Sequence, residues 1–347
     1  MIGRFFHPVW LLMAASGMSC ASPFLPRGEK SAIRNPKSAT PSWRSAIRNW
    51  HSALRIPHSA ILNVAHRGVR SLAPENTLAA LRKALQVGAD GWEVDVHPTR
   101  DGRLVVIHDD TIDRTTNARK VFPDRKPWNV SDFTLDEIRS LDAGSWFGRD
   151  DPFGQIKAGA VSADEVKSYV GEKVPTLDEV LRFTRESGRL LDIEIKQMPR
   201  RYPDVVEKVA AAVTAERMEE QIIISCFDHT CVARIKSLNR KIMAGPISND
   251  RVADPARYVK SVVRGDAWFA SGQVVGTGSL AFAGSNTVAA SYKAADLNVD
   301  DLRAVRKAGI GMFVWTINDE ATMRGLIEAG VTGIVTDFPQ RLASLSR

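Results

Sequence analysis

Short runs of apolar residues recur along the chain from Ile61 onward, and amphipathic segments separate most of them. The runs have the length of buried strands. They cover residues 61–66, 91–96, 103–108, 189–195, 221–227, 241–247, 287–291, 311–317 and 333–337. Segments with helical spacing occupy residues 77–87, 176–187, 203–217, 228–238, 299–307 and 319–329. This alternation of strands and helices predicts a parallel α/β protein.

The second and third runs are too close together for a crossover helix to join them. Asp101-Gly102 between them is a strong hairpin signal, so the third run is predicted to return antiparallel beside the second. With these two residues as the loop, Asp95 is expected to lie opposite His108. Glu93 is expected on the same side, because strand side chains alternate with a period of two.

Eight runs then remain for a parallel sheet, and an eight-stranded (β/α) barrel, the TIM-barrel fold, is the predicted architecture. A doubly wound open sheet is the alternative. It is disfavoured because no glycine-rich phosphate-binding loop follows the first run.

Residues 1–21 resemble a secretory signal, in which one Arg precedes an apolar stretch and small residues follow. Residues 22–60 form a basic, low-complexity repeat, which we expect to be a disordered linker. This segment could associate with an anionic membrane surface. The protein is therefore expected to be exported to the periplasm or beyond the cell. A cytoplasmic location is the alternative if the first segment reflects a misassigned start.

The net charge of +7 comes from this tail, because residues 1–60 contain eight Lys or Arg and one acidic residue. Residues 61–347 contain 39 basic and 39 acidic side chains. A body without net charge has no general attraction for phosphate backbones, so nucleic acid is not an expected partner. The apolar fraction of 44% is ordinary for a soluble globular protein.

Charged residues occupy the carboxyl ends of several predicted strands, where a barrel interior would otherwise be apolar. Barrel active sites lie at this end. Burial of such groups is unfavourable unless they are paired or bind a metal. The carboxylates of Glu93, Asp95 and Glu194 would suit a hard divalent cation such as Ca²⁺ or Mg²⁺.

His66 and His108 could act as an acid–base pair, because histidine titrates near neutral pH. Arg67 and Lys196 add positive charge suited to a phosphate oxygen. With a metal ion, these groups predict phosphodiester cleavage. Each also has a structural explanation: His66 could be hydrogen-bonded in the core, and Glu194 could simply pair with Lys196. The catalytic interpretation depends on all of them falling at matching strand ends.

Seven motifs, in this order, resemble those of the glycerophosphodiester phosphodiesterase family. They are AHRG (65–68), APENT (73–77), EVDV (93–96), DGRLVVIHDDTIDRTTN (101–117), IEIK (193–196), VWTIN (314–318) and GIVTDFP (333–339). The resemblance implies a barrel over residues 61–347 with a small inserted subdomain after the second strand. It also implies metal-dependent hydrolysis of a small-molecule glycerophosphodiester to glycerol 3-phosphate and an alcohol, with Ca²⁺ or Mg²⁺ as cofactor.

The resemblance also assigns roles to individual residues. The acid–base pair would be His66 and His108, the metal ligands Glu93, Asp95 and Glu194, and the substrate contacts Arg67, Lys196 and the pocket-wall Trp315. A substrate hydroxyl would attack phosphorus to give a cyclic phosphate, which water then opens.

The predicted insertion, residues 118–175, is where the chain departs from the family pattern. We expect Trp128, Trp146 and Phe147 to serve local packing, and the insertion to cap the site. Substrate preference therefore stays open, and phospholipase-D-like cleavage of lysophospholipids or sphingolipids on the same barrel is the alternative. A binding module without catalytic activity is a further alternative, but the intact histidines and acids disfavour it.

Overall fold

The structure is a computed structural model, and it describes residues 61–248, 254–264, 290–291 and 299–345. All of these residues fall within one compact unit of the chain, residues 40–347. The predicted signal segment and linker, residues 1–60, lie outside the described residues. Every helix of the described part is too short or too polar to cross a membrane.

All nine predicted runs contain a strand. Their bounds are β1 (Leu62–Ala65), β2 (Gly91–Pro98), β3 (Leu104–Val106), β4 (Leu190–Ile195), β5 (Ile222–Cys226), β6 (Met243–Pro246), β7 (Ala290–Ser291), β8 (Phe313–Trp315) and β9 (Gly333–Thr336). Eight of them are parallel, and β3 alone is antiparallel, beside β2. The prediction that the third run turns back on the second is therefore confirmed.

The parallel strands follow the order β6-β5-β4-β2-β1-β9-β8-β7. Because β1 pairs with both β2 and β9, the first strand lies beside the last. An open doubly wound sheet would instead have its first strand in the middle and its last at an edge. The barrel prediction is confirmed and the doubly wound alternative is wrong. The described residues record no ladder between β6 and β7, the two ends of this order.

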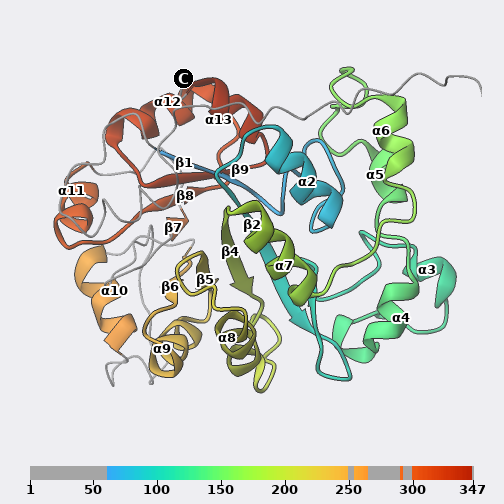
Figure 1. Cartoon of the computed structure of the whole chain (residues 1–347), viewed down its shortest axis with the longest axis horizontal. Coiled ribbons are helices and arrows are strands. Elements are labelled where there is room, and N and C mark those ends of the chain that lie inside the picture. The colour runs from blue at the N-terminus through green and yellow to red at the C-terminus, as the bar shows by residue number, and fades with distance from the viewer. Residues whose placement is uncertain (1–60, 249–253, 265–289, 292–298, 346–347) are drawn as a thin grey trace, which may run out of the picture. The chain divides into compact units, whose positions relative to one another are not determined.

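Helices surround the strands on the outside of the curled sheet (Figure 1). The six predicted helices are present as α2 (Leu78–Gln86), α7 (Leu177–Ser187), α8 (Val205–Ala215), α9 (His229–Leu238), α11 (Val299–Lys307) and α12 (Glu320–Ala329). Two more are α10 (Pro255–Arg264) and α13 (Pro339–Leu345). Local signals fix their ends: Thr176 and Glu179 form a capping box at the start of α7, and Gly188 ends it in the left-handed conformation.

The β2–β3 hairpin differs from the prediction by one residue. Val96 lies opposite Val106, and the backbone N–H of Ile107 donates to the carbonyl oxygen of Asp95. The loop contains three residues, 100–102, and closes through Gly102 at φ 73°. A three-residue loop ending in a left-handed glycine is the next common hairpin after the two-residue form. The expectation that Asp95 lies opposite His108 is therefore wrong.

The insertion between β3 and α7 contains only short helices. They are α3 (Ala118–Val121), the 3₁₀ helix η1 (Val130–Asp132), α4 (Leu135–Ser140), α5 (Ser145–Asp150) and α6 (Ala163–Ser168). An apolar cluster that includes Trp128 and Phe133 gives it a small core of its own. Trp146 and Phe147 are also buried and join the main core, so the expectation of local packing is confirmed for all three named aromatics.

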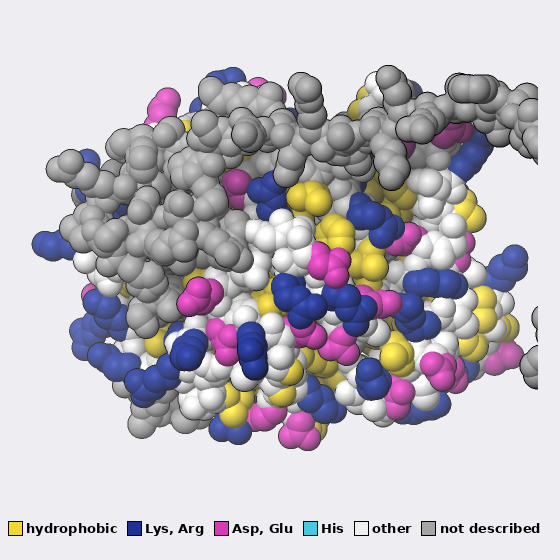
Figure 2. Space-filling model, in the orientation of Figure 1, with side chains coloured by type: hydrophobic (Ala, Val, Ile, Leu, Met, Phe, Trp, Pro, Cys, Tyr) yellow, Lys and Arg dark blue, Asp and Glu magenta, His cyan; other side chains and the backbone are white. Residues whose placement is uncertain are grey.

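The described surface mixes charges of both signs. In Figure 2, basic and acidic side chains are interspersed across the face that is viewed in Figure 1. This agrees with the balanced composition of residues 61–347.

Candidate active site

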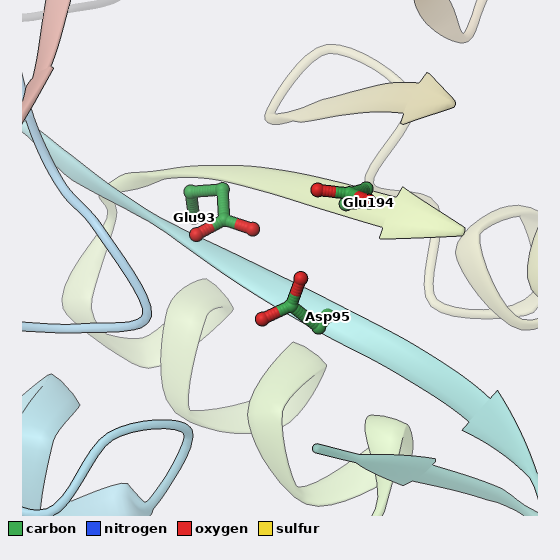
Figure 3. A group of neighbouring side chains, drawn as sticks. All are labelled: Glu93, Asp95 and Glu194. Atoms are coloured by element: carbon green, nitrogen blue, oxygen red, sulfur yellow. The ribbon is translucent and has the colours of Figure 1, made fainter. Parts of the chain in front are cut away.

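Three carboxylates lie at the centre of the barrel mouth. Glu93 and Asp95 point to the same side of β2, and Glu194 is the register partner of Asp95 on the neighbouring strand β4. Their side chains gather on one side of the sheet (Figure 3). One ligand oxygen from each lies within 4.8 Å of the others, and all three residues are at least nine-tenths buried. The predicted metal ligands are thus brought together.

This cluster fits a divalent cation. Two oxygens on one Ca²⁺ can lie up to about 5 Å apart, given bonds of about 2.3–2.6 Å. Oε1 of Glu93 is buried without a hydrogen-bond partner. Burial and the neighbouring acids raise the pKa of Glu93 well above its ordinary value, and that of Glu194 is raised as well, first by burial. Against its burial, Lys196 and Arg67 hold the pKa of Asp95 well below its ordinary value. A bound cation would relieve the remaining repulsion.

His66 follows β1 and faces the cluster. Its Nε2 lies 3.9 Å from Glu93, and its Nδ1 lies 2.7 Å from Oδ1 of Asp337, which follows β9. Burial lowers the pKa of His66, although the hydrogen bond to Asp337 opposes this. Asn318 donates to the other oxygen of Asp337 at 2.8 Å and so fixes that carboxylate. The ring centroid of Trp315 lies 6.3 Å from that of His66, at the same mouth.

His108 lies just beyond β3 and is about one-third exposed. Its Nδ1 lies 2.7 Å from Oδ1 of Asp109, and Arg114 donates two hydrogen bonds to the same carboxylate. Although burial opposes it, these contacts lower the pKa of Asp109. Arg114 also donates to Glu75, which accepts from Arg67 beside Asp95, so a chain of contacts links His108 to the cluster in spite of the shifted hairpin register.

The two predicted phosphate-binding cations are also at the mouth. Nζ of Lys196 lies 2.6 Å from Glu194 and 2.9 Å from Asp95, and these carboxylates raise its pKa against the effect of burial. The backbone N–H of Arg67 donates to Glu93 at 2.9 Å, and its Nε lies 3.5 Å from Asp95. Each cation is thus held beside the carboxylates of the paired strands β2 and β4, where a phosphate could reach it.

A pocket opens beside the cluster. Its lining consists of His66, Glu93, Asp192, Glu194, Ser225, Ile247, Trp315 and Val335. Asp192 accepts a hydrogen bond from Ser225 at 2.8 Å, and burial raises its pKa to about 7. Trp315 packs edge-on against Phe227, at 5.8 Å between centroids. Its position in the wall of this pocket agrees with the role implied by the resemblance.

Several residues of the site were missed by sequence reasoning. Asp337 and Asp192 carry the same signal as the predicted acids, a polar residue within or just after a buried strand. Glu75 and Arg114 lie in loops without periodicity, and the quoted motifs contain them without assigning them a role. Asn76 donates to Asp95 at 2.8 Å, so it belongs to the carboxylate cluster's hydrogen-bond network.

Comparisons with known proteins agree with this geometry. The model of the glycerophosphoryl diester phosphodiesterase family matches residues 66–341. A glycerophosphodiester phosphodiesterase of Caldanaerobacter subterraneus is 34% identical over 288 residues, which cover 82% of this chain and 98% of that protein. One of Bacillus subtilis is 32% identical over 286 residues, or 80% of this chain and 84% of that protein.

Solved structures are similar as well. A glycerophosphodiester phosphodiesterase of Agrobacterium tumefaciens has a TM-score of 0.59 at 29% identity, covering 81% of this chain and 98% of that one. A phosphodiesterase of Oleispira antarctica, solved with the product sn-glycerol-3-phosphate, has a TM-score of 0.60 at 24% identity, covering 81% and 94%. The chain belongs to the glycerophosphoryl diester phosphodiesterase family. Its activity is the hydrolysis of glycerophosphodiesters to glycerol 3-phosphate and an alcohol.

Proposed function

We propose that His66 and His108 are the acid–base pair of this phosphodiesterase. The divalent cation, Ca²⁺ or Mg²⁺, is held by Glu93, Asp95 and Glu194. The observation that carries this proposal is the cluster of three buried carboxylates with His66 3.9 Å from Glu93, to which His108 is linked through Arg114 and Glu75. When bound, the cation supplies a positive charge that polarises a phosphoryl oxygen and stabilises the transition state.

The protein's own groups account for the proton transfers. Because the carboxylate of Asp337 can only accept, Nδ1–H of His66 donates to it, and Nε2 keeps the lone pair that accepts a proton. The glycerol hydroxyl next to the phosphate attacks phosphorus and gives its proton to one histidine. The other histidine protonates the departing alcohol as its P–O bond breaks. Water then opens the cyclic phosphate to glycerol 3-phosphate.

Arg67 and Lys196 bind the phosphate in this proposal. Both are largely buried beside the carboxylate cluster, where a positive charge acts through a low dielectric.

The substrate is a polar, small-molecule glycerophosphodiester such as glycerophosphocholine. Five of the eight side chains that line the pocket beside His66 are polar or charged, and they offer hydrogen-bond partners to a hydroxyl-bearing glycerol group. The complex of the Oleispira antarctica protein with sn-glycerol-3-phosphate supports the same class. Trp315 would contribute the apolar wall of the pocket.

A substrate panel tests these assignments on the full chain. We expect release of glycerol 3-phosphate from glycerophosphocholine, loss of activity with a chelator, and recovery on addition of Ca²⁺ or Mg²⁺. His66→Ala and His108→Ala should each lower kcat by about 10²–10⁴-fold. The exposed Glu186→Gln should act as wild type. Full activity of the histidine variants would overturn the roles, and preferential cleavage of lysophosphatidylcholine would overturn the substrate class.

We also propose that residues 1–21 direct export and that residues 22–60 associate with anionic membrane surfaces, on the basis of their sequence pattern alone. N-terminal sequencing of the native protein tests the first point, since an exported protein should start near Ser22. Sedimentation with phosphatidylglycerol vesicles, compared with phosphatidylcholine vesicles, tests the second. A native N-terminus at Met1 would contradict export. Equal sedimentation with the two kinds of vesicle would contradict association with anionic membranes.

A further inference from the structure

The carboxylate partner of each histidine is itself held by an arginine. Asp109, which binds His108, accepts from Nε and Nη2 of Arg114 at 2.5 and 2.9 Å. Asp337, which binds His66, lies 3.7 Å from Nε of Arg70 in an ion pair. Each histidine thus has a carboxylate partner that pairs with an arginine, although Asp337 follows the last strand and Asp109 follows β3.

Both arginines converge on one residue, Glu75. Nη2 of Arg114 donates to Oε1 of Glu75 at 2.7 Å, and Nη2 of Arg70 lies 3.2 Å from Oε2. Arg67 donates to Oε1 as well, at 2.9 Å. The Glu75 side chain is only 2% exposed, so these interactions are made away from bulk solvent. Although burial opposes it, the arginines lower the pKa of Glu75 to about 2, which keeps the carboxylate charged.

A continuous chain of contacts therefore joins the two histidines. It runs through His66, Asp337, Arg70, Glu75, Arg114, Asp109 and His108. Glu75 is its midpoint and touches neither imidazole. Its own position is fixed by the backbone, because the N–H of the following residue, Asn76, donates to the carbonyl oxygen of Arg67 at 2.9 Å. The ring of Phe153, from the insertion, lies 5.1 Å from the Arg70 guanidinium and covers that side of the chain.

We propose that Glu75 is a positioning residue that, through Arg70 and Arg114, fixes the two histidine–carboxylate pairs relative to one another. This inference rests on the proposed roles of His66 and His108. Two proton transfers at opposite sides of one displacement need both imidazoles in place at once, and a shift of about 1 Å can lower a rate about 10²-fold. A single buried carboxylate that holds both arginines couples their positions. Loss of its charge would leave three arginines to repel one another.

Glu75→Gln tests this on the full chain with its cation. Two diesters of glycerol 3-phosphate are compared: glycerophosphocholine, whose leaving alcohol needs protonation, and the p-nitrophenyl diester, whose leaving group does not. We expect kcat to fall at least 10-fold with glycerophosphocholine, and at least 5-fold less with the p-nitrophenyl diester. A loss of folded enzyme would lower both equally. Equal losses, or an unchanged kcat, would overturn the proposal.

A double-mutant cycle gives a second, independent measure. In the Arg114→Met background, Glu75→Gln should lower kcat at least 3-fold less than it does in wild type, because the contact between Glu75 and Arg114 is already absent. If the double variant loses kcat by the product of the two single losses, the proposal is overturned. If Glu75→Gln does not fold, Arg114→Met alone is assayed with the two diesters. Its kcat should again fall more with glycerophosphocholine than with the p-nitrophenyl diester.

Glu137→Gln is the matched control. Glu137 also binds two arginines, Arg125 at 2.6 Å and Arg100 at 3.4 Å, but it lies in the insertion at the start of α4. Glutamine can keep its capping contact, so activity with both substrates should be that of wild type. A wild-type enzyme that cleaves neither diester would refute the proposed function itself, which separates that failure from a failure of the inference.

Discussion

Nδ1 of His66 and Oδ1 of Asp337 lie 2.7 Å apart, although 271 residues separate them in the chain. The contact exists because β1 and β9 are neighbours in the barrel. It fixes the tautomer of His66, and Asp337 should therefore be essential. We predict that Asp337→Asn lowers kcat about 10²-fold or more without a loss of folded protein, as measured by steady-state kinetics and circular dichroism. Asp319→Asn is the control, because this exposed helix cap can be kept by Asn.

The carboxylate cluster should couple cation binding to stability. A cation that binds only the folded protein stabilises it by about 2.7 kcal/mol at 100 times its dissociation constant. We predict that Ca²⁺ or Mg²⁺ raises Tm of the wild type, that Glu194→Gln removes most of this shift, and that the exposed Glu186→Gln keeps it. An equal shift in Glu194→Gln would exclude that residue as a ligand.

Lys196→Met should have opposite effects on catalysis and on cation binding. The ammonium group lies within 3 Å of both Glu194 and Asp95, so it competes with a cation for their negative charge. Its removal should lower kcat/KM about 10²-fold, by loss of a phosphate contact, and tighten cation binding about 10-fold. Calorimetric titration measures the second effect, with the exposed Lys260→Met as control. Weaker cation binding would contradict the prediction.

Buried His97 should make the fold sensitive to acid. It is fully buried, and its Nε2 lies 3.2 Å from the carbonyl oxygen of His108. Burial lowers its pKa from 6.5 to about 4. The unfolded chain therefore binds this proton first, and the stability from neutral His97 is present above pH 6.5 and is lost as pH falls toward 4. We predict that wild type loses about 2 kcal/mol more than His97→Gln between pH 7.5 and 4.5, measured by urea unfolding.

Gly68 should tolerate no side chain. A Cβ at this position would lie 2.6 Å from Cβ of Ala80 and 2.9 Å from its carbonyl carbon, and the residue has a φ of 74°. Gly68→Ala should lower the free energy of unfolding by about 2–4 kcal/mol, because packing and backbone strain add. Gly88 has a φ of 82° with nothing within 4 Å, so Gly88→Ala should lower it by only about 1 kcal/mol. Thermal unfolding compares the two, and equal effects would refute the packing argument.

Local pattern was sufficient to predict the main elements of the barrel. All nine runs contain strands, and six amphipathic segments are helices, because buried strands and amphipathic helices each have a characteristic period. The helices of the insertion escaped prediction because most have only four to six residues, too few for a period to emerge. The hairpin register could not be fixed either, since Asp101-Gly102 fits loops of two or three residues equally well.

Most of the predicted site residues were found by one rule, that charge at the carboxyl end of a buried barrel strand needs a reason, whereas Trp315 came from the family resemblance alone. The rule brought out Glu93, Asp95 and Glu194, and the structure brings them together. It did not reveal Glu75 or Arg114, because these residues lie in loops and act through side-chain contacts with distant segments.

The sequence by itself determined the order of strands and helices, the parallel barrel and the acids and bases at its mouth, because these follow from local periodicity and from a general rule of the fold. Only the tertiary structure decided which carboxylate holds which histidine, and that Glu75 joins Arg70 to Arg114. Such contacts depend on where loops from distant parts of the chain meet in space, and the spacing of residues along the chain does not record that.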